Sequence, residues 1–211
     1  MLRFVFSSQK ATIGGPAIFI DRDGVINRRR PGDYVLNWSQ FIFMPDIRSA
    51  LKQLSSLRLP MIIISNQAAV GKNLLDPSDL EKITAQLHQT LLTDGVSLFA
   101  AYYCPHRSTK NCICRKPKPA LLYQAASDFK IDLARSIFIG DSDTDVQAAR
   151  SAGCQPILFG TGLRSCSKSQ DWLTALPVAH TSSELFQVAV DSLQIAKHAA
   201  TRGRVASEES R

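Results

Sequence analysis

Apolar residues in this chain form short continuous runs that alternate with segments in which apolar positions recur every three or four residues. The runs are rich in Ile, Val and Phe, which is typical of strands buried on both faces. We predict strands at 17–21, 61–65, 96–103, 136–140 and 156–159. Helical spacing predicts helices at 46–57, between Asp76 and Gly95, from Pro119 to Phe129, through Val146 and Ala149 as far as Gly153, and at about 183–196.

Strands that alternate with helices predict an α/β protein in which helices cover both faces of a parallel sheet. At 211 residues the chain has room for one well-buried domain, which we place at residues 16–198. Residues 1–15 are predicted to form a short N-terminal extension. The segment 199–211 is polar and has little to bury, so it is predicted to be disordered.

Polar residues gather where three of these strands end. The first strand runs into Asp21-Arg22-Asp23-Gly24-Val25-Ile26-Asn27, the second into Ser65-Asn66-Gln67, and the fourth into Gly140-Asp141-Ser142-Asp143-Thr144-Asp145. Arg115-Lys116-Pro117 precedes the helix before that fourth strand. Because ligands bind at the carboxyl ends of strands in open parallel sheets, we expect these four motifs to meet at one site.

The combination suits hydrolysis of a phosphate ester. Asp21 at the strand tip can attack phosphorus, and Asp23 can protonate the leaving oxygen and later deprotonate water. Because a carboxylate is repelled by a phosphoryl anion, the site needs positive charge, and Mg²⁺ held by Asp21 and Asp141 would supply it. Lys116 and the Ser65 hydroxyl can neutralise and orient the remaining phosphoryl oxygens.

Each motif has a more ordinary explanation when it is taken alone. An aspartate pair after a strand is common in a turn that caps a helix, and the acidic cluster at 141–145 can satisfy the dipole of a helix N-terminus. Ser-Asn-Gln and Arg-Lys-Pro triplets are common in loops. The occurrence of all four, in this order and each at a strand end or helix start, favours a functional site.

At these residues the sequence resembles the haloacid dehalogenase superfamily, whose signatures are DxDG, a Ser or Thr, a Lys and a terminal acidic motif. The resemblance covers roughly residues 16–165. It implies a Rossmann-like three-layer sandwich without a large cap domain, and a phosphatase that forms an aspartyl-phosphate intermediate. It also implies that Mg²⁺ is held by the Asp21 side chain, the Asp23 backbone carbonyl and Asp141. The other polar residues of these motifs are expected to contact substrate: Asn27, Asn66, Gln67, Arg115 and Ser142.

A narrower resemblance rests on DRDGVIN, on DYV at 33–35 and on the Cys- and His-containing stretch that ends in CICRKP. This pattern is similar to the subfamily of heptose-bisphosphate and histidinol-phosphate phosphatases. It implies a small phosphorylated metabolite as substrate, with the 7-phosphate of D-glycero-D-manno-heptose 1,7-bisphosphate as the first expectation. The positive charges of 28–30 and Arg115 favour a doubly phosphorylated sugar over the cationic histidinol phosphate. A polynucleotide 3′-phosphatase is a further alternative.

Four potential zinc ligands lie in the loop 104–114. Cys104, His106, Cys112 and Cys114 provide three sulfurs and one imidazole, a complete tetrahedral set for Zn²⁺. Four protein ligands leave no open position for water, so we expect a structural zinc that shapes the loop carrying Arg115 and Lys116. A chance cluster of buried thiols is the alternative.

The net charge of +7 suits anionic ligands. It also raises the possibility of a zinc-bearing nucleic-acid-binding module, but that function leaves the aspartates unexplained, and we expect no nucleic-acid partner. No apolar run approaches the ~18 residues of a membrane-spanning helix, and the start of the chain lacks a secretory signal core. We therefore predict a cytoplasmic protein without a membrane partner, acting as a monomer.

Overall fold

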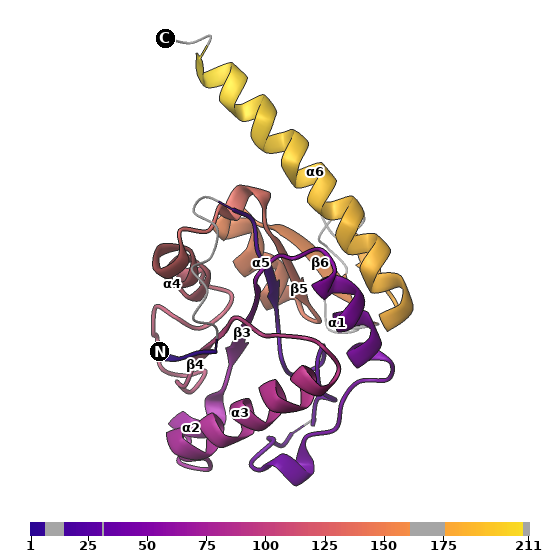
Figure 1. Cartoon of the computed structure of the whole chain (residues 1–211). Helices are drawn as coiled ribbons and strands as arrows, with labels where there is room; N and C mark the ends of the chain where they lie inside the picture. The colour runs from indigo at the N-terminus through magenta and orange to yellow at the C-terminus, as the bar shows by residue number, and fades with distance from the viewer. Residues whose placement is uncertain (7–14, 31, 161–175, 209–211) are drawn as a thin grey trace.

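The computed structural model describes residues 1–6, 15–30, 32–160 and 176–208. Within these ranges the chain forms a seven-stranded sheet of order β1-β4-β3-β2-β5-β6-β7 (Figure 1). All neighbouring strands are parallel except β1 and β4, which pair antiparallel at one edge. The strands are β1 (Leu2–Val5), β2 (Ile18–Ile20), β3 (Met61–Asn66), β4 (Ala100–Cys104), β5 (Ile137–Gly140), β6 (Gln155–Phe159) and β7 (Val178–Ala179).

Helices cover both faces of this sheet. They are α1 (Ile47–Ser55), α2 (Ala68–Gly71), α3 (Pro77–Thr93), α4 (Ala120–Phe129), α5 (Asp143–Ala152) and α6 (Ser182–Glu208), with 3₁₀ turns η1 (Trp38–Gln40) and η2 (Leu133–Arg135). Apolar residues of α1, α3 and α6 belong to one core, and those of α4 and α5 belong to a second core. The predicted three-layer α/β sandwich is therefore confirmed.

The central strands are apolar throughout because they are buried on both faces. In β2, Ile18 and Ile20 pack into the first core, whereas Phe19 packs into the second. Successive side chains of a strand point to opposite faces, so each residue of such a strand must be apolar. This requirement is why continuous apolar runs located these strands in the sequence.

The predicted strand at 96–103 begins too early. In the structure β4 starts at Ala100, and the backbone N–H of Val96 instead donates to the Leu91 carbonyl at the end of α3. Val96 and Leu98 are nevertheless fully buried. Buried loop residues therefore extended the apolar run beyond the true strand.

The two ends of the chain differ from their predictions. Leu2–Val5, placed in the N-terminal extension, form the edge strand β1 and pair with β4. At the other end α6 continues to Glu208, through most of the segment 199–211 that was predicted to be disordered. Figure 1 shows this helix lying along one side of the body and then extending away from it.

The sheet order places the site. β2 lies between β3 and β5, and the three strands are parallel, so their carboxyl ends are adjacent. Among the described residues, the segment between β2 and β3 forms η1 and α1 and adds no separate cap domain, as predicted. Within the same ranges, no helix combines the length and the apolar character that crossing a membrane requires.

Candidate active site

A cavity of about 550 Å³ lies at the carboxyl ends of these central strands. Its walls include residues 21–23, 65–67, 115–116 and 142–144. The structure thus brings together the four motifs that the sequence placed at strand ends and helix starts. The remaining wall comes from residues 29–30 and 32–35, which follow the first of these motifs.

Lys116 is the buried cation of the site. Its Nζ lies 3.0 Å from Asp21 Oδ1 and 2.6 Å from Asp145 Oδ1, and it donates to the Ile64 carbonyl oxygen at 2.9 Å. Burial alone would lower the pKa of Lys116, but Asp145 and Asp21 together raise it above its usual value, so the ammonium stays charged. Burial raises the pKa of Asp21, and the attraction of Lys116 opposes this shift. One lysine therefore balances two carboxylates that water hardly reaches.

Asp23 is surrounded by hydrogen-bond donors. Arg22 donates to both of its carboxylate oxygens at 2.9–3.2 Å, Asn27 Nδ2 donates to Oδ1 at 2.8 Å, and Gln67 Nε2 donates to Oδ2 at 2.7 Å. Burial pushes the pKa of Asp23 upward, but the charge of Arg22 and these hydrogen bonds outweigh it and lower the pKa. In this conformation Asp23 is an ionised, firmly oriented carboxylate.

Asp141 completes an acidic cluster with Asp21 and Asp145, whose ligand oxygens lie within 4.8 Å of one another. Burial and then the charge of Asp21 raise the pKa of Asp141 to about 7. Three carboxylates at such spacing suit a divalent cation with oxygen ligands. Gly24 makes room for this cluster, since a Cβ at its position would collide with the Asp141 carboxylate. Its φ of +101° also disfavours any other residue.

The residues predicted to bind substrate fall into two groups. Asn66, Gln67, Arg115 and Ser142 line the cavity. Asn27 does not fit its prediction, because it is fully buried, is not among the lining residues, and uses its amide to hold Asp23. Asn66 also supports the site, since its side chain pairs with the backbone N–H and carbonyl of Lys116 at 3.1 and 3.2 Å.

Three charged residues of the site make contacts that were not predicted from the sequence. Asp145 belongs to the acidic motif, but its ion pair with Lys116 joins positions far apart in the chain. Arg22 is almost completely buried, although arginine is usually exposed. Arg29 donates to Asp141 Oδ1 at 2.6 Å. The sequence signal for Arg22 was its place within the first motif, and Arg29 was noted only as part of the positive run 28–30.

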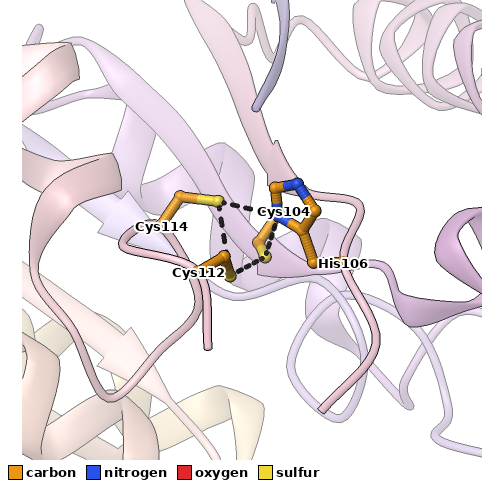
Figure 2. A group of neighbouring side chains, drawn as sticks. All are labelled: Cys104, His106, Cys112 and Cys114. Carbon is orange, nitrogen blue, oxygen red and sulfur yellow. Dashed lines mark hydrogen bonds between the residues drawn. The ribbon is translucent and has the colours of Figure 1, made fainter. Parts of the chain in front are cut away.

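The four predicted zinc ligands converge on one point, as Figure 2 shows. The sulfur of Cys112 lies 3.6 Å from that of Cys104 and 3.8 Å from that of Cys114. His106 Nδ1 lies 3.6 Å from Cys104 Sγ and 3.3 Å from Cys114 Sγ. Tetrahedral zinc with ordinary bond lengths requires about 3.8 Å between sulfurs and about 3.5 Å between sulfur and nitrogen. The ligand set therefore fits Zn²⁺ in both chemistry and spacing.

The Cys/His cluster is connected to the cavity by Arg115 and Lys116, which follow Cys114 directly. Arg115 Nη1 donates to the His106 carbonyl oxygen at 3.3 Å, across the cluster. Lys118 Nζ donates to the Cys112 carbonyl oxygen at 2.8 Å and so stabilises the second half of the loop. A change in the cluster would therefore be transmitted to two residues of the cavity wall.

Comparison with known proteins identifies the class of this site. The HAD-hydrolase-like family model matches residues 113–184. A crystal structure of D,D-heptose 1,7-bisphosphate phosphatase from B. bronchiseptica, complexed with magnesium and phosphate, is similar with a TM-score of 0.75 and 28% identity, covering 83% of this chain and 98% of that one. A putative HAD-like phosphatase from Mesorhizobium loti shares the fold, with a TM-score of 0.78 and 23% identity over 92% of this chain and 93% of that one. The fold and the site define a phosphatase of the haloacid dehalogenase superfamily, a phosphoric monoester hydrolase.

Proteins of similar sequence identify the family within this superfamily. The D-glycero-alpha-D-manno-heptose-1,7-bisphosphate 7-phosphatase of Mycobacterium tuberculosis is 34% identical over 177 residues, 79% of this chain and 93% of the relative. The D-glycero-beta-D-manno-heptose-1,7-bisphosphate 7-phosphatase of Helicobacter pylori is 39% identical over 137 residues, 64% of this chain and 78% of the relative. The chain belongs to the family of manno-heptose-1,7-bisphosphate 7-phosphatases, which confirms the resemblance drawn from its motifs.

Proposed function

We propose that this protein removes the 7-phosphate from a D-glycero-D-manno-heptose 1,7-bisphosphate in a magnesium-dependent reaction. The observation that carries the proposal is that Asp21 and Lys116 line one cavity and are ion-paired, while Asp141 forms an acidic cluster with Asp21. The names of the relatives supply the substrate class. The carboxylates of Asp21 and Asp141 and the backbone carbonyl of Asp23 would hold Mg²⁺, which would neutralise charge on the transferred phosphoryl group.

Asp21 is the proposed nucleophile. Its Oδ1 accepts a hydrogen bond from the Arg22 backbone N–H at 2.7 Å and lies 3.0 Å from Lys116 Nζ, so Oδ2 is the oxygen left to attack. A bond forms between Oδ2 and phosphorus while the ester bond to the sugar breaks. Asp23 is ionised in the substrate-free site, so as the general acid it must take up a proton when substrate binds and then give it to the leaving oxygen. Water then attacks the phosphorus of the aspartyl phosphate, and Asp23 takes its proton. Phosphate leaves, and Asp21 is regenerated.

Lys116 and Ser65 position the phosphoryl group in this proposal. Lys116 reaches Asp21 directly, and Ser65 lines the cavity beside it. Preformed positive charge in a site that excludes water stabilises the transition state more than the same charge would in solution. Asn27 and Gln67 contribute indirectly, because both hold the Asp23 carboxylate in place.

The charges around the cavity support a substrate with a second phosphate. Arg29, Arg30 and Arg115 all line it. A distal phosphate on the sugar would be attracted by these guanidinium groups, whereas the ammonium group of histidinol phosphate would be repelled. This difference favours the bisphosphate over the amine as the substrate.

A structural zinc is part of the proposal. Cys104, His106, Cys112 and Cys114 would hold it, and the closed loop would present Arg115 and Lys116 to the cavity. Burial raises the pKa of the Cys104 thiol to about 12, and a bound metal ion would stabilise its thiolate.

Phosphate release from a panel of substrates tests the proposal. The panel contains both anomers of the heptose bisphosphate, histidinol phosphate and a 3′-phosphorylated oligonucleotide, each assayed with and without Mg²⁺. We expect the highest kcat/KM for a heptose bisphosphate, dependence on Mg²⁺, and no turnover by the Asp21→Asn variant. A higher kcat/KM for histidinol phosphate would overturn the substrate assignment, and substantial turnover by Asp21→Asn would overturn the nucleophile.

A further inference from the structure

The side chain of Arg29 reaches from the exposed segment after β2 into the acidic cluster. It is 52% exposed, yet its Nη2 donates to Asp141 Oδ1 at 2.6 Å and to the Asp23 carbonyl oxygen at 3.4 Å. These are two of the three oxygens that the proposed function assigns to Mg²⁺. The guanidinium group therefore lies where the metal ion would bind.

The charges of the cluster explain why a cation is held there. Lys116 balances Asp21 and Asp145, at 3.0 and 2.6 Å. The ion pair of Asp141 in the described part of the chain is with Arg29. Without Arg29 or a metal ion, Asp141 would lie within 4.8 Å of two other carboxylates with no cation of its own.

Metal and guanidinium cannot share these oxygens. Mg²⁺ binds oxygen at about 2.0–2.1 Å with nearly octahedral geometry. A Mg²⁺ ion bound to Asp141 Oδ1 and the Asp23 carbonyl would compete with Arg29 Nη2, which donates to the same two atoms at 2.6 and 3.4 Å. Arg29 lines the cavity, and Asp141, which Arg29 contacts, is not among the lining residues.

We propose that Arg29 is a built-in counter-ion of the metal site, which stabilises the metal-free enzyme and which a divalent cation must displace. The inference rests on the magnesium site of the proposed function. Displacement leaves the guanidinium of Arg29 in the cavity it already lines, beside Arg30 and Arg115, where the anionic substrate binds. One side chain thereby links loading of the metal to the positive charge available for the substrate.

Calorimetric titration with MgCl₂ tests this competition. The protein is purified without added divalent cations and dialysed into magnesium-free buffer, with no strong chelator, so that zinc is retained. Wild type, Arg29→Gln and Arg30→Gln are compared. Arg30 is the matched control, because it lines the same cavity and carries the same charge but pairs with Asp33. We expect Arg29→Gln to bind Mg²⁺ about three- to tenfold more tightly, and Arg30→Gln to remain within about twofold of wild type.

Thermal unfolding of the same proteins separates competition from general charge repulsion. If Arg29 is the counter-ion, Arg29→Gln has a lower Tm than wild type without Mg²⁺ and the same Tm at saturating Mg²⁺. An unchanged or weaker Mg²⁺ affinity in Arg29→Gln overturns the inference. Equal tightening in both variants, without a loss of metal-free stability in Arg29→Gln, also overturns it.

Whether wild type binds Mg²⁺ distinguishes failure of this inference from failure of the proposed function. Wild type that binds Mg²⁺, with no change in Arg29→Gln, refutes the role of Arg29 and leaves the proposed function standing. Wild type that binds no Mg²⁺ refutes the metal site itself, and with it this inference.

Discussion

A single buried residue can neutralise charges that no neighbouring residue could neutralise in its place. Lys116 is the example, since it contacts two carboxylates and a backbone carbonyl while only 3% exposed. Removing one partner from a buried ion pair is costly because the remaining charge has neither water nor a counter-ion. The stability of the site and its proposed chemistry therefore depend on the same ammonium group.

Lys116→Met tests this dependence. It leaves Asp21 and Asp145 buried beside each other without their cation, so we expect the free energy of unfolding to fall by about 3–5 kcal/mol. Urea denaturation at pH 7 measures the change. Lys82→Met is the control, because Lys82 is 73% exposed and water screens its pair with Asp79. A similar loss in both variants would contradict a special role for Lys116.

Gly24 allows a second prediction at the same scale. Gly24→Ala would push a methyl group into the Asp141 carboxylate, so we expect Mg²⁺ affinity to fall about tenfold or more. Gly95→Ala is the matched control, since its φ is also positive, at +79°, but a Cβ there meets nothing within 4 Å. Calorimetric titration of both variants separates the collision from backbone strain. Equal Mg²⁺ affinities in the two variants would contradict the prediction that the added methyl group disturbs Asp141.

The elements could be predicted from the sequence where burial alone determines them. β2, β3, β5 and β6 are apolar because both faces are covered, and the helices between them follow apolar spacing. β1 could not be found in this way, because only alternate residues are partly buried and its pairing with β4 joins distant parts of the chain. β7, of two residues, is too short to leave a pattern.

The same distinction applies to the site. Its motifs were predictable because parallel strands bring their carboxyl ends together, and the spacing of Cys104, His106, Cys112 and Cys114 already suited zinc. The pairing of Arg29 with Asp141 was not predictable, because residues 112 positions apart meet only through the order of the strands. Asn27 was placed in the substrate group because it belongs to the first motif, but its side chain is fully buried and donates to Asp23 Oδ1 and the Arg28 carbonyl oxygen.

The loop 104–114, proposed to bind zinc, is an element whose contribution can be measured separately from the cavity. A zinc-selective chelator followed by excess Mg²⁺ should leave the proposed magnesium site filled and the loop open. We expect a Tm lower by about 4–8 °C, as for a loss of about 2 kcal/mol, and a KM that rises more than kcat falls. Metal analysis confirms removal, and readdition of Zn²⁺ should restore both values. Unchanged KM and Tm after verified removal would refute the structural role.

His88 in α3 predicts how stability depends on pH. Its ring stacks on Phe6 with centroids 4.3 Å apart, and burial lowers its pKa below the usual 6.5. The unfolded chain therefore binds a proton more readily than the folded one, so this contribution to stability is full above pH 6.5 and is lost as the pH falls below it.

Urea unfolding between pH 5.5 and 7.5 checks the sign. We expect His88→Leu to reduce the slope of stability against pH, with an upper limit of about 1.4 kcal/mol per pH unit for a single group. His180→Gln, at an exposed position, should leave the slope as in wild type. A slope that survives in His88→Leu would assign the pH dependence to other groups.

At the scale of the whole molecule, the sheet positions the strand ends that carry the site. β2 is the middle strand of seven, with helices on both faces and two separate cores. Asp21 is therefore attached to one of the most buried parts of the protein. Arg29 and Arg30 beside it are by contrast 52% and 38% exposed. The buried, proposed nucleophile thus lies beside partly exposed positive charge.

The pairing of β1 with β4 has a practical consequence for anyone who labels or immobilises this protein. Leu2 lies opposite Tyr103, one residue before the first cysteine of the zinc loop, and burial and then the amino-terminal charge lower the pKa of His106. Figure 1 shows the outer end of α6 far from this region. A dye or surface tether is therefore best attached near the outer end of α6, since cargo attached ahead of Met1 would lie beside the loop that carries the Cys/His cluster.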